Sequence, residues 1–126
     1  MNELEQGSVR ISNDVVATIA GLAAVDTSGV AGMSGGISEG ITKKLSGKQV
    51  QKGVSVEVGE QEAAIDLKVI VHYGSKIHEV CRELQENVKE AIENMTGLQV
   101  VEVNVKVEGV AFKEEEPLAL EPAKIK

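Results

Sequence analysis

The chain has 126 residues, of which 42% are hydrophobic and 2% are aromatic, so it is long enough for one domain with an aliphatic core. Its formal net charge of −7 argues against non-specific binding to nucleic acid or to an anionic membrane, because both require a positive surface. The single cysteine, Cys81, excludes an internal disulfide and is typical of a reducing cytosol.

The first residues and the apolar runs bear on location. The start, MNELEQG, is acidic and lacks the apolar stretch of a signal peptide. No apolar run approaches the length needed to span a bilayer. We therefore expect a cytoplasmic protein with residues 1–6 as a short flexible N-terminus. If the protein works at a membrane, a partner must hold it there.

The first predicted elements are a short strand and a helix. Val9 and Ile11 alternate with polar residues, which predicts a strand, and Ser12 is then placed to cap a helix that ends near Gly29. Residues 30–33 add a short extended piece. Apolar residues recur at helical spacing, so we expect the buried face of this helix to contain Val15, Val16, Ile19, Ala20, Leu22 and Ala23.

Two strands are predicted next, because the apolar period changes to two. Residues 54–58 alternate valine with polar residues, and residues 65–73 alternate in the same way after a turn at residues 59–62. The short connection between them predicts a hairpin. We expect the second strand to bury one face, consisting of Ile65, Leu67, Val69, Val71 and Tyr73.

A longer helix and a last strand complete the pattern. Ser75 is placed to cap the helix and Gly97 to end it. Steps of three and four residues predict a buried stripe of Ile77, Val80, Cys81, Leu84, Val88, Ala91, Ile92 and Met95. Valines alternate with polar residues from Val101 to Val107, and residues 113–126, with a glutamate run and both prolines, predict a flexible acidic tail.

This order of elements predicts an α+β fold. Strand, helix, two strands, helix and strand, with a Gly/Lys-rich excursion after the first helix, favour a two-layer sandwich. We expect one mainly antiparallel sheet with both helices on one face. The valine face of the sheet would meet the helices, and the other face would be polar apart from Ile70. Residues 7–112 are predicted to form a single domain.

A glycine-rich segment with nearby lysines, GVAGMSGGISEGITKKLSGK, resembles a phosphate site at first sight. A Walker A loop is excluded, because Thr42 stands where its first glycine must be and Gln49 where its metal-binding hydroxyl must be. No Gly-x-Gly-x-x-Gly register fits either. Two Gly-x-x-Gly spacings remain, as in the KH-domain loop that clamps nucleic acid, although a turn followed by a flexible connection is the simpler interpretation.

The same segment is locally basic. Between Glu39 and Lys52, four lysines and one acid give a charge of +3 on an otherwise acidic chain. Such a segment either docks an acidic partner or remains an ordinary solvated loop. The residues that we expect to contact a partner, if it does so, are Gly32, Gly35, Gly36, Lys43, Lys44 and Lys48.

Catalytic and metal-binding arrangements find little support. His78 and Cys81 lie three residues apart on the long helix, but zinc needs about four ligands. Cys81 also falls on the buried stripe, where its thiol should be inert. No Gly-x-Ser-x-Gly nucleophile elbow occurs, and the predicted open sheet face has no aromatic residue on which bases would stack. We expect no catalytic residues, no cofactor and no metal.

Four segments in their mutual order resemble the alkaline shock protein family of Gram-positive bacteria. They are GSVRISNDVVATIAGLAAVDTSGVAGM (7–33), KGVSVEV (52–58), IDLKVIVHYGSKIHEV (65–80) and MTGLQVVEVNVKVEGVAF (95–112). The phrases VVATIAGLAA, GVAGM and NVKVEGV at their spacing carry the resemblance, which covers nearly the whole chain before the tail. The Gly/Lys excursion looks like the family's variable loop.

The resemblance implies a small cytosolic protein without catalytic activity, linked to cell-envelope homeostasis and stress response. It implies self-association and attachment to the membrane by a separate small anchor protein. We therefore expect a non-enzymatic adaptor or scaffold that binds protein partners through an exposed sheet edge or the Gly/Lys loop. The alternatives are a KH-like nucleic-acid binder and, since some paralogues are connected with fatty-acid synthesis, a regulator of an enzyme in that pathway.

Overall fold

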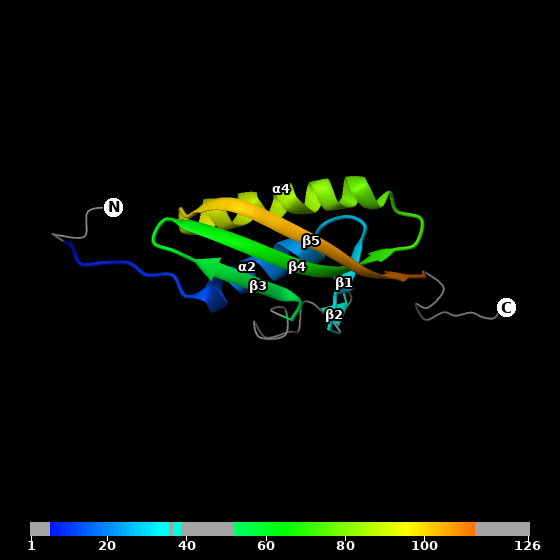
Figure 1. The fold of residues 1–126 in the computed structure, drawn as a ribbon, viewed down its shortest axis with the longest axis horizontal. Helices are drawn as coiled ribbons and strands as arrows, with labels where there is room; N and C mark the ends of the chain where they lie inside the picture. Colours follow the sequence, from blue (N-terminus) through cyan, green and yellow to red (C-terminus); the bar gives the residue numbers. More distant parts are fainter. Residues whose placement is uncertain (1–5, 36, 39–51, 113–126) are drawn as a thin grey trace.

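The two-layer sandwich expected from the sequence is confirmed by a computed structural model, which describes residues 6–35, 37–38 and 52–112. A five-stranded sheet forms one layer, and two helices cover one of its faces (Figure 1). The expected flexible ends and most of the Gly/Lys excursion lie outside the described residues, so these expectations stay predictions.

Helix α2 (Asn13–Val25) begins as predicted but is rotated relative to the expected orientation. Ser12 is its N-cap, and its side-chain oxygen accepts a hydrogen bond of 3.2 Å from the Val15 N–H. Val15 and Leu22, expected in the core, are exposed. The helix is apolar on nearly all sides, so packing rather than periodicity selects the buried face. That face contains Val16, Ala17, Ile19, Ala20, Gly21, Ala24 and Val25.

The strand expected around Val9 and Ile11 is wrong. The described residues between Gly7 and Ser12 have no regular structure, and Val9 is exposed. Ile11 packs against the core without joining the sheet. The alternation of Val9 and Ile11 therefore does not indicate a strand, because only Ile11 is packed against the core and Val9 remains exposed.

The central strand of the sheet is β4 (Glu62–His72), and two antiparallel strands lie end to end along one of its edges. β3 (Val54–Val58) pairs with its first half, which confirms the predicted hairpin. β1 (Val30–Met33) pairs with its second half. The short β2 (Ile37–Ser38) adds to the outer edge of β1.

The junction between β1 and β3 is tight at Lys68. The Lys68 N–H donates to the Gly53 carbonyl (2.8 Å), and the Ser34 N–H donates to the Lys68 carbonyl (2.9 Å). Gly53 has φ +80°, and a Cβ there would lie 2.8 Å from the Ser34 carbonyl oxygen, so only glycine fits. A Cβ on Gly35 would lie 3.2 Å from the Lys52 Cβ, so the chain leaves β1 and returns toward β3 at neighbouring points.

The other edge of β4 is occupied by β5 (Gln99–Ala111), and this ladder is parallel. The prediction of a mainly antiparallel sheet holds for the other pairs, but the longest pair differs from them. The reason is α4 (Ile77–Thr96), which crosses the sheet and returns the chain to the end where β4 began.

The ends of α4 fit the prediction only in part. Gly97 ends the helix in the left-handed conformation (φ 78°), as expected. The predicted cap at Ser75 is wrong, because the N-cap is Lys76, which has no capping side-chain bond. Ser75 instead lies in the turn after β4, where its N–H donates to the His72 carbonyl (3.1 Å).

The core lies between the sheet and the two helices. Alternate residues of β4 face the stripe of α4, as predicted. These fully or nearly fully buried residues are Ala63, Ile65, Leu67, Val69, Val71, Val80, Leu84, Val88 and Ile92. The predicted buried faces are too long at their ends, since Tyr73, Ile77 and Met95 are exposed. These three residues lie at element ends, where the opposite layer no longer covers them.

Candidate protein-interaction surfaces

The glycines behind the nucleic-acid interpretation have structural roles. Gly32 lies within β1 and pairs with Ile70 and Ser38, so it is part of the ladder. Gly29 has φ +95°, and a Cβ there would lie 2.5 Å from Val80 Cγ2 on α4. A KH-type clamp needs a loop that closes on nucleic-acid backbone, whereas these two glycines are held by the sheet and by helix packing.

Of the remaining residues that are predicted to contact a partner, the structure describes only Gly35. Gly35 is exposed at the turn after β1, with φ +114°. Gly36, Lys43, Lys44 and Lys48 lie outside the described residues. The expectation that they contact a partner therefore stays a prediction.

The histidines and the cysteine do not assemble into a site. Within residues 6–35, 37–38 and 52–112, no three His, Cys, Asp or Glu side chains are placed to hold a metal ion. Cys81 is half-buried, and this burial raises the pKa of its thiol. A raised pKa leaves less thiolate, so Cys81 is a poor nucleophile near neutral pH.

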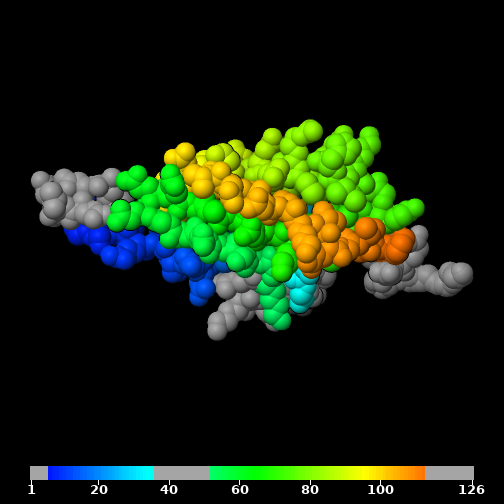
Figure 2. Space-filling model, viewed as in Figure 1, coloured from blue at the N-terminus to red at the C-terminus, as the bar shows by residue number. Residues whose placement is uncertain are grey.

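The sheet face opposite the helices is polar, as predicted, and lies open in Figure 2. The Asn104 amide donates to Asp66 and to Glu102, both at 2.8 Å. The Ser34 hydroxyl donates to Glu108 at 2.6 Å, and this bond is the main cause that lowers the pKa of the Glu108 carboxyl. These side chains bind one another, both within β5 and between β5 and neighbouring segments.

Ile70, the one large apolar residue expected on that face, is explained by packing. It is half-buried, and a Cβ on Gly109 of β5 would lie only 3.0 Å from Ile70 Cδ1. The chain's two aromatic residues, Tyr73 and Phe112, contact each other with ring centroids 5.0 Å apart. They form one pair at the end of the sheet, rather than the spread of stacking positions that RNA-binding sheets use.

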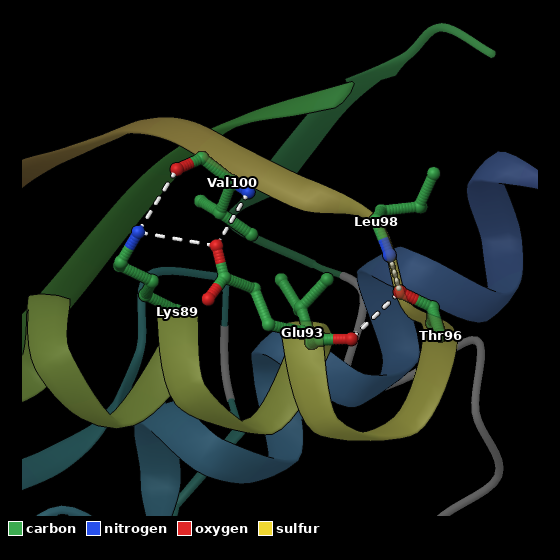
Figure 3. A network of polar contacts seen from close by, with 6 residues as sticks. Lys89, Glu93, Thr96, Leu98 and Val100 are labelled. Atoms are coloured by element: carbon green, nitrogen blue, oxygen red, sulfur yellow. Dashed lines mark hydrogen bonds and ion pairs between the residues drawn. The ribbon is translucent and has the colours of Figure 1, made fainter. Parts of the chain in front are cut away.

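One flank of α4 binds the outer edge of β5 (Figure 3). Glu93 Oε2 accepts hydrogen bonds from the Val100 N–H (2.9 Å) and from Lys89 Nζ (3.1 Å). Lys89 Nζ also lies 3.3 Å from the Val100 carbonyl oxygen, and Gln85 Nε2 donates to the Val103 carbonyl (2.8 Å). The bond from Val100, followed by the one from Lys89, lowers the pKa of Glu93.

These contacts cover part of a sheet edge that would otherwise be open. Both backbone groups of Val100 and the carbonyl of Val103 bind side chains of α4. An added strand needs such groups free, so it cannot pair along this stretch of β5. Along β5, the expectation of docking at a sheet edge is therefore restricted to the part beyond Val103, and the outer edges of β2 and β3 are not affected by these contacts.

The other flank of α4 faces α2 across a groove of about 740 Å³. Leu22 of α2 (44% exposed) and Met95 of α4 (72% exposed) contribute apolar surface to it. The other lining residues are Ile19, Ala23, Val25, Asp26, Asn87, Glu90, Ala91 and Asn94. We refer to this feature as the α2–α4 groove.

Sequence reasoning misses this groove, although it selects two of the residues in it. The helical periodicity predicts both Leu22 and Met95 to be buried, whereas both are exposed. The usable signal is the excess of apolar residues in α2, which carries more than one face can bury. The groove offers apolar contacts beside two carboxylates, Asp26 and Glu90, an arrangement suited to binding another molecule.

These features define a small α+β domain with a partly apolar groove between its two helices. The model of the alkaline shock protein 23 family, described as having a cell envelope-related function, matches residues 1–112, so this chain belongs to that family. The resemblance to alkaline shock proteins noted in the sequence is thereby confirmed.

Three relatives illustrate the range of similarity. YloU of Bacillus subtilis is 41% identical over 106 residues, covering 82% of this chain and 88% of the relative. YqhY of the same organism is 34% identical, covering 84% of this chain and 78% of the relative. A stress response regulator gls24 homologue of Streptococcus pyogenes is 33% identical, covering 87% of this chain and 62% of the relative. Of the helices that the structure describes, neither is long and apolar enough to cross a membrane.

Proposed function

We propose that this chain is a non-enzymatic adaptor in the cell-envelope stress response, acting through protein–protein contacts. Its family has a cell envelope-related function, and one set of relatives carries the name of stress response regulators. The observation that carries the proposal is the α2–α4 groove, where Leu22 and Met95 keep apolar surface exposed to water.

Exposed apolar surface in a groove favours a partner on physical grounds. Fully burying one Leu or Met side chain contributes roughly 1.5–3 kcal/mol. Single exposed apolar residues are ordinary, but apolar residues gathered in a concave site are typical of interaction surfaces. The groove therefore supports an adaptor better than the polar sheet face does, because the side chains of that face already bind one another.

The proposal includes membrane attachment through a partner protein, such as a small membrane anchor. The net charge of −7 disfavours direct contact with an anionic bilayer, which supports an intermediary. No described residue favours the regulation of a fatty-acid-synthesis enzyme in particular. The nucleic-acid alternative loses support, because packing accounts for Gly29 and Gly32.

Cell fractionation under alkaline stress tests the proposal. We expect the chain to sediment partly with membranes, and the double variant Leu22→Glu/Met95→Glu to move to the soluble fraction. Ile77→Glu is a single-site control, because Ile77 is 42% exposed on the same α4 but lies at the opposite end from Met95. A wild-type chain that stays soluble under stress, or identical fractionation of all three proteins, would overturn the proposal.

A further inference from the structure

We infer that the α2–α4 groove receives an amphipathic α-helix from a partner protein, with Lys or Arg residues beside its apolar stripe. This inference rests on the proposed adaptor function and names the chemistry of the partner. It follows from the shape of the groove, the apolar residues in it, and the sign of the charges around it.

The shape and lining of the groove fit a helix. Its walls are two helices and none of its lining residues belongs to a strand, so an occupant helix would pack against both α2 and α4 on the outer side of the helical layer. The lining residues of α4 recur at steps of three and four, from Asn87 through Glu90 and Ala91 to Asn94 and Met95. This stretch spans about 12 Å along the axis, which is room for roughly two helical turns and two or three apolar anchors.

The charges in the groove have one sign. Among the described residues that line it, Asp26 and Glu90 are acidic and none is Lys, Arg or His. Helix α2 has no basic residue at all. Lys89, one residue before Glu90, does not offset these charges, because it binds Glu93 and the Val100 carbonyl on the other flank of α4.

Charge complementarity therefore selects a cationic partner. A second copy docked through the same face would set Asp26 and Glu90 against their own counterparts, in a protein of net charge −7. An anionic lipid surface meets the same repulsion. A helix with Lys or Arg beside its apolar stripe satisfies both the apolar lining and the two carboxylates.

Fluorescence anisotropy with designed peptides tests the inference on the full chain. One labelled probe of about four helical turns is an amphipathic helix of Leu and Lys, and the comparison probe replaces each Lys with Glu. We expect saturable binding of the Leu/Lys peptide and at least about tenfold weaker binding of the Leu/Glu peptide. Leu22→Glu/Met95→Glu should weaken the Leu/Lys complex about tenfold or more, whereas Ile77→Glu should leave it unchanged.

A charge-matched pair separates groove binding from general attraction to an acidic protein. Asp26→Asn/Glu90→Gln should weaken Leu/Lys binding about threefold at low salt and reduce its salt dependence. Glu57→Gln/Glu79→Gln removes the same charge at exposed positions outside the groove and should have no such effect. Equal losses in the two pairs would overturn the inference. Circular dichroism of each variant checks that the fold is retained.

Two outcomes assign the groove to another occupant and would overturn the inference, and two further outcomes separate the inference from the proposed adaptor function. Sedimentation that shows a dimer lost in Leu22→Glu assigns the groove to a second copy. Groove-dependent binding to phosphatidylglycerol vesicles assigns it to lipid. If no peptide binds while membrane fractionation still depends on Leu22 and Met95, the inference fails and the proposed adaptor function stands. If the Leu/Lys peptide binds but fractionation is groove-independent, the adaptor proposal fails alone.

Discussion

The two flanks of α4 meet their neighbours in opposite ways. Toward β5, Gln85, Lys89 and Glu93 bind backbone groups of the strand edge, so this flank is closed by hydrogen bonds. Toward α2, Met95 and Leu22 leave apolar surface open in a groove. The difference shows that one helix can both protect a sheet from unwanted strand pairing and leave apolar surface exposed on its other side.

Each kind of contact suits its flank. Long polar side chains can reach the backbone of an edge strand and occupy the groups that another strand would use. An apolar groove has no such directional bonds to offer, so it selects its occupant by shape and burial, with nearby charges setting orientation. Four expected results, from the largest effect to the smallest, test this contrast.

The largest difference in stability is expected between a substitution on the buried face of α4 and one on the flank that lines the groove. Leu84 is fully buried, so Leu84→Ala should lower the free energy of unfolding by about 2–5 kcal/mol. Met95→Ala should change it by no more than about 0.5 kcal/mol, because Met95 is exposed. Urea unfolding followed by circular dichroism measures both. A large loss for Met95→Ala would mean that the groove is part of the core.

A smaller loss of stability is expected when the hydrogen bonds between α4 and β5 are weakened. Glu93→Gln removes the charge that accepts from Val100 and Lys89, so the melting temperature should fall. Glu90→Gln is the matched control, since Glu90 lines the groove three residues away, and it should leave stability nearly unchanged. Equal melting temperatures for the two variants would contradict the contrast.

At acid pH, the difference in stability between the wild type and Glu93→Gln should disappear. The pKa of Glu93 is lowered in the folded state, so its stabilising contribution is present above the unfolded pKa of a glutamate. The contribution is lost as the pH falls through the folded pKa. Unfolding measured from neutral pH down to acid should therefore show the two stabilities converging, and a constant gap would mean that the charge is irrelevant.

The smallest effect is expected at Gln85. Gln85→Ala removes the exposed bond to the Val103 carbonyl and should cost less than about 1 kcal/mol. Its sharper consequence is local, because the outer edge of β5 becomes open to another strand. Analytical ultracentrifugation at high concentration should show more association for Gln85→Ala than for Glu86→Ala, which changes an exposed neighbour on the same helix.

The fold is predictable from the sequence where one pattern dominates a segment. The stripe of α4 and the alternation in β4 correctly predict that Leu84, Val88 and Leu67 are buried. Helix α2 is harder, because apolar residues surround it and its sequence does not define one buried face. Periodicity therefore predicts Val15 and Leu22 to be buried, whereas the packed helix leaves both exposed.

The sequence predicts individual apolar residues of the candidate site, but it does not predict that they line one groove. A groove depends on how two helices sit side by side, and Leu22 and Met95 are far apart in the sequence. The hydrogen bonds along β5 likewise join Gln85 and Val103, residues that no local pattern connects. The prominent glycines Gly29 and Gly32 serve packing and strand pairing instead.

The junction at Lys68 bears on how the length of this protein can vary. Gly35 and Lys52 lie against each other, and Ser34 and Gly53 are both bound to Lys68, so the chain leaves β1 and returns to β3 at neighbouring points. Doubling the length of a flexible connection adds only about 0.6 kcal/mol of closure cost. Insertions and deletions between Ser38 and Lys52, after β2, should therefore accumulate without disturbing the sheet, the hydrogen bonds along β5 or the groove.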